Sequence, residues 1–141
     1  VLWSEGRQVV AFYHHADTAG RHPELWPGDA VPSVWPNTAE APKMVSLLEA
    51  HYARGPVPSS SSSPGGARFR VWQGVLTPSG TTVLQHLGRT LQDVCGAVAI
   101  RNVRHFMRGK GVGPRGLNIV IADFVEMEDF IPSVLALNPK E

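Results

Sequence analysis

The chain has 141 residues, of which 43% are hydrophobic, and its 13 Lys and Arg nearly balance its 12 Asp and Glu. This hydrophobic fraction is ordinary for a globular domain, and the balanced charge gives no general attraction for nucleic acid. The sequence has no run of about 18 apolar residues and no secretory signal at Val1-Leu2-Trp3. It contains a single cysteine, Cys95. We therefore expect a cytoplasmic protein without disulfides or a multi-cysteine metal site.

A strand and a loop are predicted first. Residues 8–13, Gln-Val-Val-Ala-Phe-Tyr, form a short apolar run of the kind that favours a strand buried on both faces, as in parallel sheets. Residues 24–37 are rich in proline and include Trp26 and Trp35. Because proline interrupts regular structure, this segment is predicted to be a structured loop with no helix or strand.

A helix is predicted to follow the loop. Asn37 is its expected N-cap, since Glu40 lies three residues later at the spacing of a capping box, and Gly55 is its expected end. Residues 56–66, which include five consecutive serines, are predicted to be a flexible loop inside a single domain spanning residues 1–141. The apolar residues that recur at helical spacing in the predicted helix are Met44, Leu47, Leu48 and Tyr52.

The second half of the chain contains two more predicted strands and three helical patterns. The strands are residues 69–76 and 117–125, and a glycine-rich loop at 109–116 precedes the latter. The apolar positions that mark the three helices are Leu84, Leu87, Leu91 and Val94 for the first, Ile100, Val103 and Met107 for the second, and Phe130, Val134 and Leu137 for the last.

The alternation of strands and helices predicts an α/β fold. Strands separated by helices are typical of a parallel sheet with crossover connections. A complete α/β barrel usually needs about 250 residues, and this chain has 141. Two interpretations therefore remain open from the pattern: a small open sheet, or a part of a larger fold.

Four segments, in chain order, resemble a known family. They are Leu-Trp-Pro-Gly at 25–28, Trp35 with Asn37-Thr38, Val-Leu-Thr-Pro at 75–78 and Asn-Ile-Val-Ile-Ala-Asp-Phe-Val at 118–125. With these segments the chain resembles the stand-alone phosphatidylinositol-specific phospholipase C X-domain-containing proteins of animals, over nearly its whole length. It departs from the family pattern in the serine run and at Pro36, both in predicted loops.

The resemblance implies a fold and an activity. The implied fold is the C-terminal half of a distorted TIM-type (β/α) barrel, with parallel strands and outer helices. The implied activity is that of a phosphoric diester hydrolase of the phosphatidylinositol phospholipase C type, acting in lipid metabolism. The family's two catalytic histidines belong to the other half, the first of them in a Ser-His-Asp tripeptide that does not occur here. The chain by itself is therefore expected to be inactive.

Asp123 is the candidate catalytic residue. It follows an apolar strand pattern, and the sites of α/β barrels are built at the carboxyl ends of their strands. The resemblance places here the aspartate that supports a catalytic histidine, whose tautomer a carboxylate fixes and whose protonated form it stabilises. The alternative is an exposed aspartate that only caps the turn after the strand.

Three other residues are candidates for substrate binding. Tyr13 and His14 end the first predicted strand, and Thr77 ends the second, so parallel strands would bring all three to the same edge. Their expected ligand is the inositol ring or phosphate of a phosphoinositide-type phospholipid. The alternative reading is that all three are ordinary loop residues at strand ends.

No metal or cofactor is predicted. The spacing of His14, His15 and His22 matches no standard ligand pattern. The motif Gly-Val-Gly-Pro-Arg-Gly at 111–116 precedes a strand, whereas a dinucleotide fingerprint follows one. Trp26 and Trp35 are candidates for peripheral contact with a membrane surface. The alternatives to the hydrolase are a truncated, non-catalytic fold and a small α/β binding module.

Overall fold

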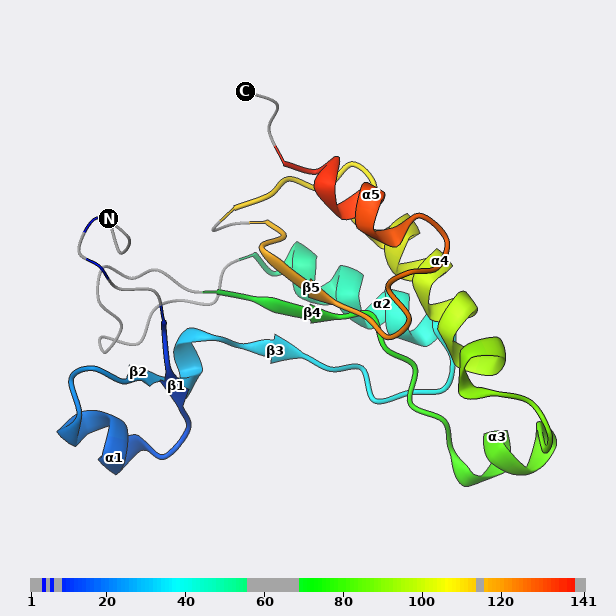
Figure 1. The fold of residues 1–141 in the computed structure, drawn as a ribbon, viewed down its shortest axis with the longest axis horizontal. Helices are drawn as coiled ribbons and strands as arrows, with labels where there is room; N and C mark the ends of the chain where they lie inside the picture. Colours follow the sequence, from blue (N-terminus) through cyan, green and yellow to red (C-terminus); the bar gives the residue numbers. More distant parts are fainter. Residues whose placement is uncertain (1–3, 5, 7–8, 56–68, 114–115, 139–141) are drawn as a thin grey trace. The chain divides into compact units, whose positions relative to one another are not determined.

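The computed structural model describes residues 4, 6, 9–55, 69–113 and 116–138. The predicted serine-rich loop at 56–66 lies outside these residues. The chain divides into two compact units: a smaller unit of residues 1–32 and 58–69, and a larger unit of residues 33–57 and 70–141. Figure 1 shows the elements of both units.

The smaller unit contains a two-stranded parallel sheet. Strand β1 (Phe12–Tyr13) pairs with β2 (Trp26–Pro27), and helix α1 (Ala16–Arg21) lies between them in the sequence. The ring of Phe12 packs edge-on against the rings of Trp26 and Phe69, with centroids 5.9 and 5.8 Å away. A single turn of 3₁₀ helix, η1 (Gly28–Ala30), follows β2.

The larger unit contains a three-stranded parallel sheet in the order β3-β4-β5. Its strands are β3 (Ser33–Val34), β4 (Val71–Gln73) and β5 (Ile119–Ile121). The register pairs Val34 with Trp72, and Trp72 with Val120. The predicted α/β class with parallel strands is thus confirmed.

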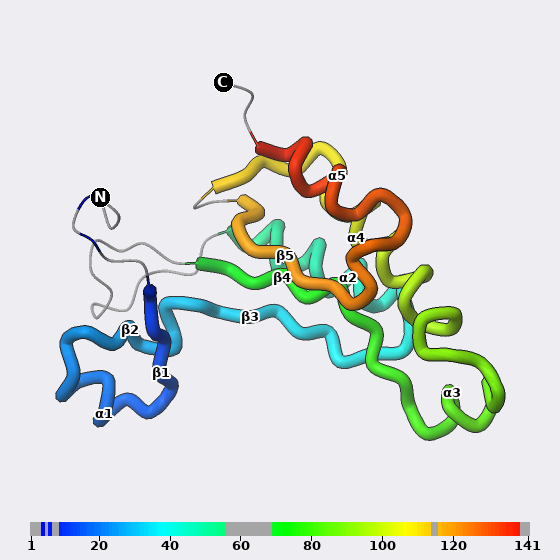
Figure 2. The backbone as a smooth tube through the Cα atoms, viewed as in Figure 1, coloured from blue at the N-terminus to red at the C-terminus, as the bar shows by residue number. Residues whose placement is uncertain are grey.

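Helices connect the strands of the larger unit. Helix α2 (Ala41–Ala53) joins β3 to β4, and Figure 2 follows the chain through this crossover. Between β4 and β5 the chain forms α3 (Gly80–Gln85), the π-helical turn η3 (Gln92–Gly96) and α4 (Ala97–Met107), and after β5 it ends in α5 (Phe130–Leu135). The buried core comprises Met44 and Leu48 of α2, Trp72 of β4, Ile100, Val103 and Phe106 of α4 and Phe130 of α5.

The prediction that residues 24–37 hold no regular structure was wrong. This segment contains β2, η1 and β3. The sheet of β1 and β2 can include a proline because Trp26 donates its backbone N–H to the carbonyl oxygen of Ala11 at 2.8 Å, and Pro27, which has no N–H, stands at the strand's end. Strand β1, which forms the end of the strand predicted at 8–13, pairs with β2.

The predicted start of the first long helix was also wrong. Helix α2 begins at Ala41 with Glu40 as N-cap, whereas Asn37 has a left-handed backbone with φ of 45°. The hydroxyl of Thr38 accepts the backbone N–H of Glu40 at 3.2 Å, so a local turn precedes the helix. The predicted end is confirmed, since Gly55 follows the helix with φ of 70°.

Residues 84–94 do not form the single amphipathic helix that their spacing predicts. Helix α3 ends at Gln85, and Gly88 takes a left-handed φ of 86° that turns the chain before η3 begins. Leu84 and Leu87 are consequently 70% and 75% exposed. The predictions around Ile100 and Phe130 are confirmed by α4 and α5, which bury these side chains.

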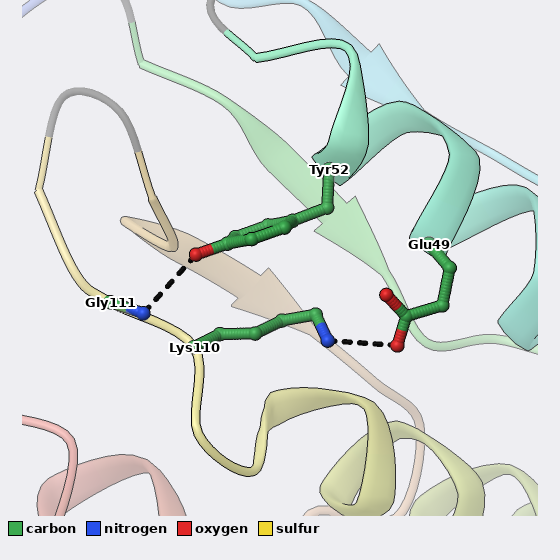
Figure 3. Close-up of polar contacts among 4 residues, drawn as sticks. All are labelled: Glu49, Tyr52, Lys110 and Gly111. Atoms are coloured by element: carbon green, nitrogen blue, oxygen red, sulfur yellow. Dashed lines mark hydrogen bonds and ion pairs between the residues drawn. The ribbon is translucent and has the colours of Figure 1, made fainter.

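A polar clasp holds the loop after α4 against α2 (Figure 3). Lys110 forms an ion pair of 2.8 Å with Glu49, and its ammonium nitrogen lies 4.6 Å from the ring centroid of Phe106 and 5.1 Å from that of Tyr52. The hydroxyl of Tyr52 accepts the backbone N–H of Gly111 at 3.2 Å. The aromatic rings favour the cation and limit its contact with water, so this pair is better placed to contribute stability than a fully exposed pair.

None of the helices in the described ranges combines the length and apolar character that crossing a membrane requires.

Candidate functional site

The carboxyl ends of β3, β4 and β5 meet at one edge of the larger unit's sheet. Thr77 follows β4 and Thr38 follows β3, and the backbone N–H of Thr77 donates to the carbonyl oxygen of Thr38 at 2.9 Å. Asp123 comes two residues after the end of β5. Two of the predicted site residues, Thr77 and Asp123, therefore lie in the segments that leave this edge after the neighbouring strands β4, which ends at Gln73, and β5, which ends at Ile121.

Asp123 has an exposed side chain in the turn after β5. The predicted strand at 117–125 is shorter in the structure, since β5 ends at Ile121 and Phe124 has a left-handed φ of 56°. This bend after the strand leaves the carboxylate of Asp123 open to solvent, where a ligand or another side chain can reach it.

The turn that holds Asp123 packs against the π-helical turn η3. A Cβ atom on Gly96 would lie 2.5 Å from the Cδ2 atom of Phe124, so only glycine leaves room for this ring. The side-chain amide of Gln92 also donates to the sulfur of Met127 at 3.4 Å. Single π-helical turns inside α-helices are frequent at functional sites, and this one contacts the turn of the candidate aspartate.

The charge of Asp123 affects the ionisation of Cys95 in η3. Burial raises the pKa of the Cys95 thiol, and the negative charge of Asp123 raises it further. A raised thiol pKa keeps Cys95 protonated near neutral pH, which is the opposite of what a nucleophilic cysteine needs. Cys95 is buried and belongs to the hydrophobic core of the larger unit.

Sequence reasoning missed Gly96 and Phe124 as residues that shape this site. A glycine inside an otherwise helical stretch costs stability, so a packing reason for Gly96 could have been sought. The left-handed conformation of Phe124 has no comparable signal in the sequence, because aromatic residues rarely adopt it.

The remaining predicted site residues, Tyr13 and His14, belong to the smaller unit. Tyr13 is 48% exposed, and His14 is exposed at the end of β1. The ring of His14 lies over Gly28, where an added Cβ atom would stand 2.7 Å from the imidazole Cγ. Gly28 thus leaves the space that the ring of His14 occupies.

The neighbouring histidines have local structural roles. The Nδ1 atom of His15 accepts the backbone N–H of Thr18 at 3.4 Å and so caps α1, while His22 lies 3.0 Å from a carboxylate oxygen of Glu24. In the part of the chain that the structure describes, no three histidine, cysteine or acidic side chains gather as metal ligands would.

The two tryptophans of the proline-rich segment differ in their packing and exposure. Trp26 packs against Phe12 and Phe69 in the smaller unit, as a structural residue does. Trp35, just after β3 in the larger unit, is 56% exposed.

A cavity of about 200 Å³ is lined by α3, by the turn after α3 and by η3. Pro78, directly after Thr77, lines one part of it, and Cys95 and Val94 of η3 line another. The rest of its lining comes from residues 82–91, which overlap the amphipathic helix predicted from Leu84, Leu87, Leu91 and Val94.

The chain is similar to curated proteins over nearly all of its length. It is 35% identical over 137 residues to PI-PLC X domain-containing protein 3 of Homo sapiens, a match that covers 97% of this chain and 40% of the relative. It is 32% identical to PI-PLC X domain-containing protein 2 of Mus musculus and to PI-PLC X domain-containing protein 1 of Homo sapiens, with 97% and 99% of this chain covered. The chain belongs to the family of PI-PLC X domain-containing proteins.

The match to the PI-PLC X domain-containing proteins extends across both units, since it leaves only a few residues of this chain uncovered. The chain spans about 40% of the length of these relatives. No family model matches the chain, and no solved structure matches it.

Proposed function

We propose that this chain is the C-terminal portion of a phosphatidylinositol-specific phospholipase C, a phosphoric diester hydrolase of lipid metabolism. The observation that carries the proposal is the position of Asp123. It stands at the carboxyl edge of a parallel sheet in a chain that aligns almost end to end with PI-PLC X domain-containing proteins. Parallel strands with helical crossovers are also what half of a distorted (β/α) barrel would contain.

The proposed reaction is attack of the inositol 2-hydroxyl on the phosphorus of the phospholipid. One histidine takes the proton of this hydroxyl, and another gives a proton to the diacylglycerol leaving group. Both histidines would be supplied by a segment that this chain does not span. The carboxylate of Asp123 would hold one of them in the productive tautomer and stabilise its imidazolium form.

Thr77, Tyr13 and His14 are proposed to bind the substrate. The backbone N–H of Thr77 is held by its hydrogen bond to the carbonyl oxygen of Thr38, so the Thr77 hydroxyl would be offered to the ligand from a fixed position. Tyr13 and His14 have exposed polar groups at the end of β1 that suit an inositol hydroxyl or a phosphate. The protein would work in the cytoplasm at the surface of membranes, where its phospholipid is found.

Two linked experiments test this proposal. The first is to sequence the transcript upstream of Val1, which should encode a Ser-His-Asp tripeptide and a second histidine at a strand end. The second is to incubate the encoded protein with phosphatidylinositol and follow the phosphorus product by nuclear magnetic resonance. Formation of a cyclic inositol phosphate supports the proposal. A transcript without these histidines, or a protein with them that leaves the lipid intact, rejects it.

A further inference from the structure

A small cavity lies between helices α4 and α5, which run side by side in the larger unit (Figure 1). Its volume is about 70 Å³. Because one molecule of liquid water takes about 30 Å³, this space suits about two waters or one small ion. We call it the α4–α5 cavity, and its lining residues are Arg104, Met107, Arg108, Ser133 and Leu137.

The side chain of Arg104 is held in a fixed orientation at the α4–α5 cavity. Its Nε atom donates to the hydroxyl oxygen of Ser133 at 2.9 Å, and this hydroxyl donates to the backbone carbonyl oxygen of Asp129 at 2.7 Å. These bonds use one of the five N–H groups of the guanidinium. The other four have no hydrogen bond among the described residues, so Arg104 can offer them to a ligand while Ser133 acts as a positioning residue.

Arg108 brings a second positive charge to the α4–α5 cavity. It follows Arg104 by four residues, the spacing that places two side chains on one face of a helix. No carboxylate lines the cavity, and neither arginine forms an ion pair within the described part of the chain. The carboxyl end of α4 carries roughly half a negative charge from its dipole, which the two guanidinium charges outweigh. The cavity is therefore positively charged and suits an anion.

We propose that Arg104 and Arg108 bind a phosphate group in the α4–α5 cavity, either inorganic phosphate or the phosphate of a soluble monoester. A phosphate presents at least three free oxygens, so it can accept hydrogen bonds from both guanidinium groups, whereas one guanidinium fork already occupies the two oxygens of a carboxylate. The small volume admits the phosphate group alone, and the rest of a monoester stays in solvent. The inference does not rest on the proposed function, because Asp123 and Thr77 do not line this cavity.

Calorimetric titration of the whole protein containing this chain with inorganic phosphate, at constant ionic strength, tests the inference. We expect a dissociation constant on the order of 1 mM, and binding at least about tenfold weaker in Arg104→Gln and in Arg108→Gln. The matched control is Arg101→Gln, which removes the same charge from α4. Arg101 is exposed, donates its Nε to the carbonyl oxygen of Ala97 and does not line the cavity, so this variant should bind as the wild type does.

Two further variants separate phosphate binding from folding. Ser133→Ala keeps both charges but frees the guanidinium of Arg104, so it should bind phosphate several-fold more weakly, and Ser133→Thr, which retains the hydroxyl, should bind as the wild type does. Arg108 is exposed, so Arg108→Gln should unfold at the wild-type midpoint in chloride buffer although it binds phosphate poorly. Normal phosphate affinity in Arg108→Gln, or equal loss of affinity in Arg101→Gln, overturns the inference.

The source of the phosphate group is tested with two other probes. Glycerol 1-phosphate should bind about as tightly as inorganic phosphate, because only its phosphate enters the cavity, and both ions should shift the nuclear magnetic resonance signal of the Arg104 Nε–H group. A protein that sediments with phosphatidic acid vesicles but binds neither soluble ion has a lipid site instead, which overturns the inference. An unchanged Arg104 signal at phosphate concentrations about tenfold above the expected dissociation constant overturns it as well.

Discussion

Gly96 and Phe124 fit together so closely that a methyl group on Gly96 would stand 2.5 Å from the aromatic ring. The contact joins the π-helical turn η3 to the turn after β5, although 28 positions separate the two residues in the sequence (124 minus 96). Phe124 is directly next to Asp123, so this contact fixes the backbone that carries the candidate catalytic carboxylate.

The first prediction concerns Gly96→Ala. Alanine normally stabilises a helix relative to glycine by about 0.5–1 kcal/mol, but here its methyl group has to displace the ring of Phe124. We expect a net loss of about 1–3 kcal/mol in the free energy of unfolding, measured by urea denaturation.

Gly80→Ala is the matched control for this substitution. Gly80 begins α3, and an added Cβ atom there meets nothing within 4 Å. This variant should be as stable as the wild type or slightly more so. A Gly96→Ala protein of unchanged stability would show that Phe124 does not occupy this place.

The thiol of Cys95 reports on the position of Asp123. Burial raises the pKa of this thiol first, and the charge of Asp123 adds to the rise. Asp123→Asn should therefore lower the Cys95 pKa and speed alkylation by iodoacetamide at a fixed pH, and Cys95 is the single cysteine of the sequence. The control is Glu126→Gln, whose exposed carboxylate is not among the causes of the shift. Identical alkylation rates in wild type and Asp123→Asn would place the carboxylate elsewhere.

Tyr52→Phe tests the polar clasp between α2 and the loop after α4. The variant keeps the ring, which packs 5.9 Å from Trp72 and beneath Lys110, but removes the acceptor of the Gly111 N–H. A loss of about 1 kcal/mol in the free energy of unfolding is expected. Tyr13→Phe should cause no comparable loss in the free energy of unfolding, since the Tyr13 hydroxyl has no hydrogen bond within the described part of the chain. Equal effects of the two substitutions would count against the clasp.

His51 makes stability depend on pH. Burial lowers its pKa from the ordinary 6.5, and the positive charges of Arg54 and Arg70 lower it further. Below pH 6.5 the unfolded chain therefore binds this proton more readily than the folded chain, so stability falls as the pH drops from 6.5 toward the lowered value. His51→Gln should lose less stability over this range than the wild type, as measured by urea unfolding at several pH values. Parallel pH profiles of the two proteins would disprove the assignment.

The part of the fold that the sequence predicted correctly depends on local patterns. Met44 and Leu48 recur at helical spacing and are both buried in α2, and the apolar run before Asp123 forms β5. Helix periodicity and strand alternation are properties of neighbouring residues, so they can be recognised without knowing the tertiary contacts.

The errors concern contacts that are distant in the sequence. The strand at Trp26 exists because Ala11 offers a carbonyl oxygen, and nothing near Pro27 reveals this partner. The spacing of Leu84 and Leu87 indicates one face of a helix but not which residues would pack against that face. The helix does not continue through this segment, because Gly88 has a left-handed backbone.

The candidate site was predicted in part for the same reasons. The sequence placed Thr77 and Asp123 at strand ends, whereas β4 ends at Gln73 and β5 at Ile121, so both residues lie in the segments that follow these parallel strands. It could not reveal the packing of Phe124 on Gly96, which depends on a rare backbone conformation. The participation of Tyr13 and His14 in the same site stays a prediction, because they belong to the smaller unit.

The most direct test of the proposed function is the rate of phosphatidylinositol hydrolysis by the whole protein with Asp123→Asn. Asparagine keeps the size of the side chain and removes the charge that would support a catalytic histidine. We expect kcat to fall by roughly 10²- to 10⁴-fold with little change in KM. A variant that hydrolyses the lipid at the wild-type rate would contradict it.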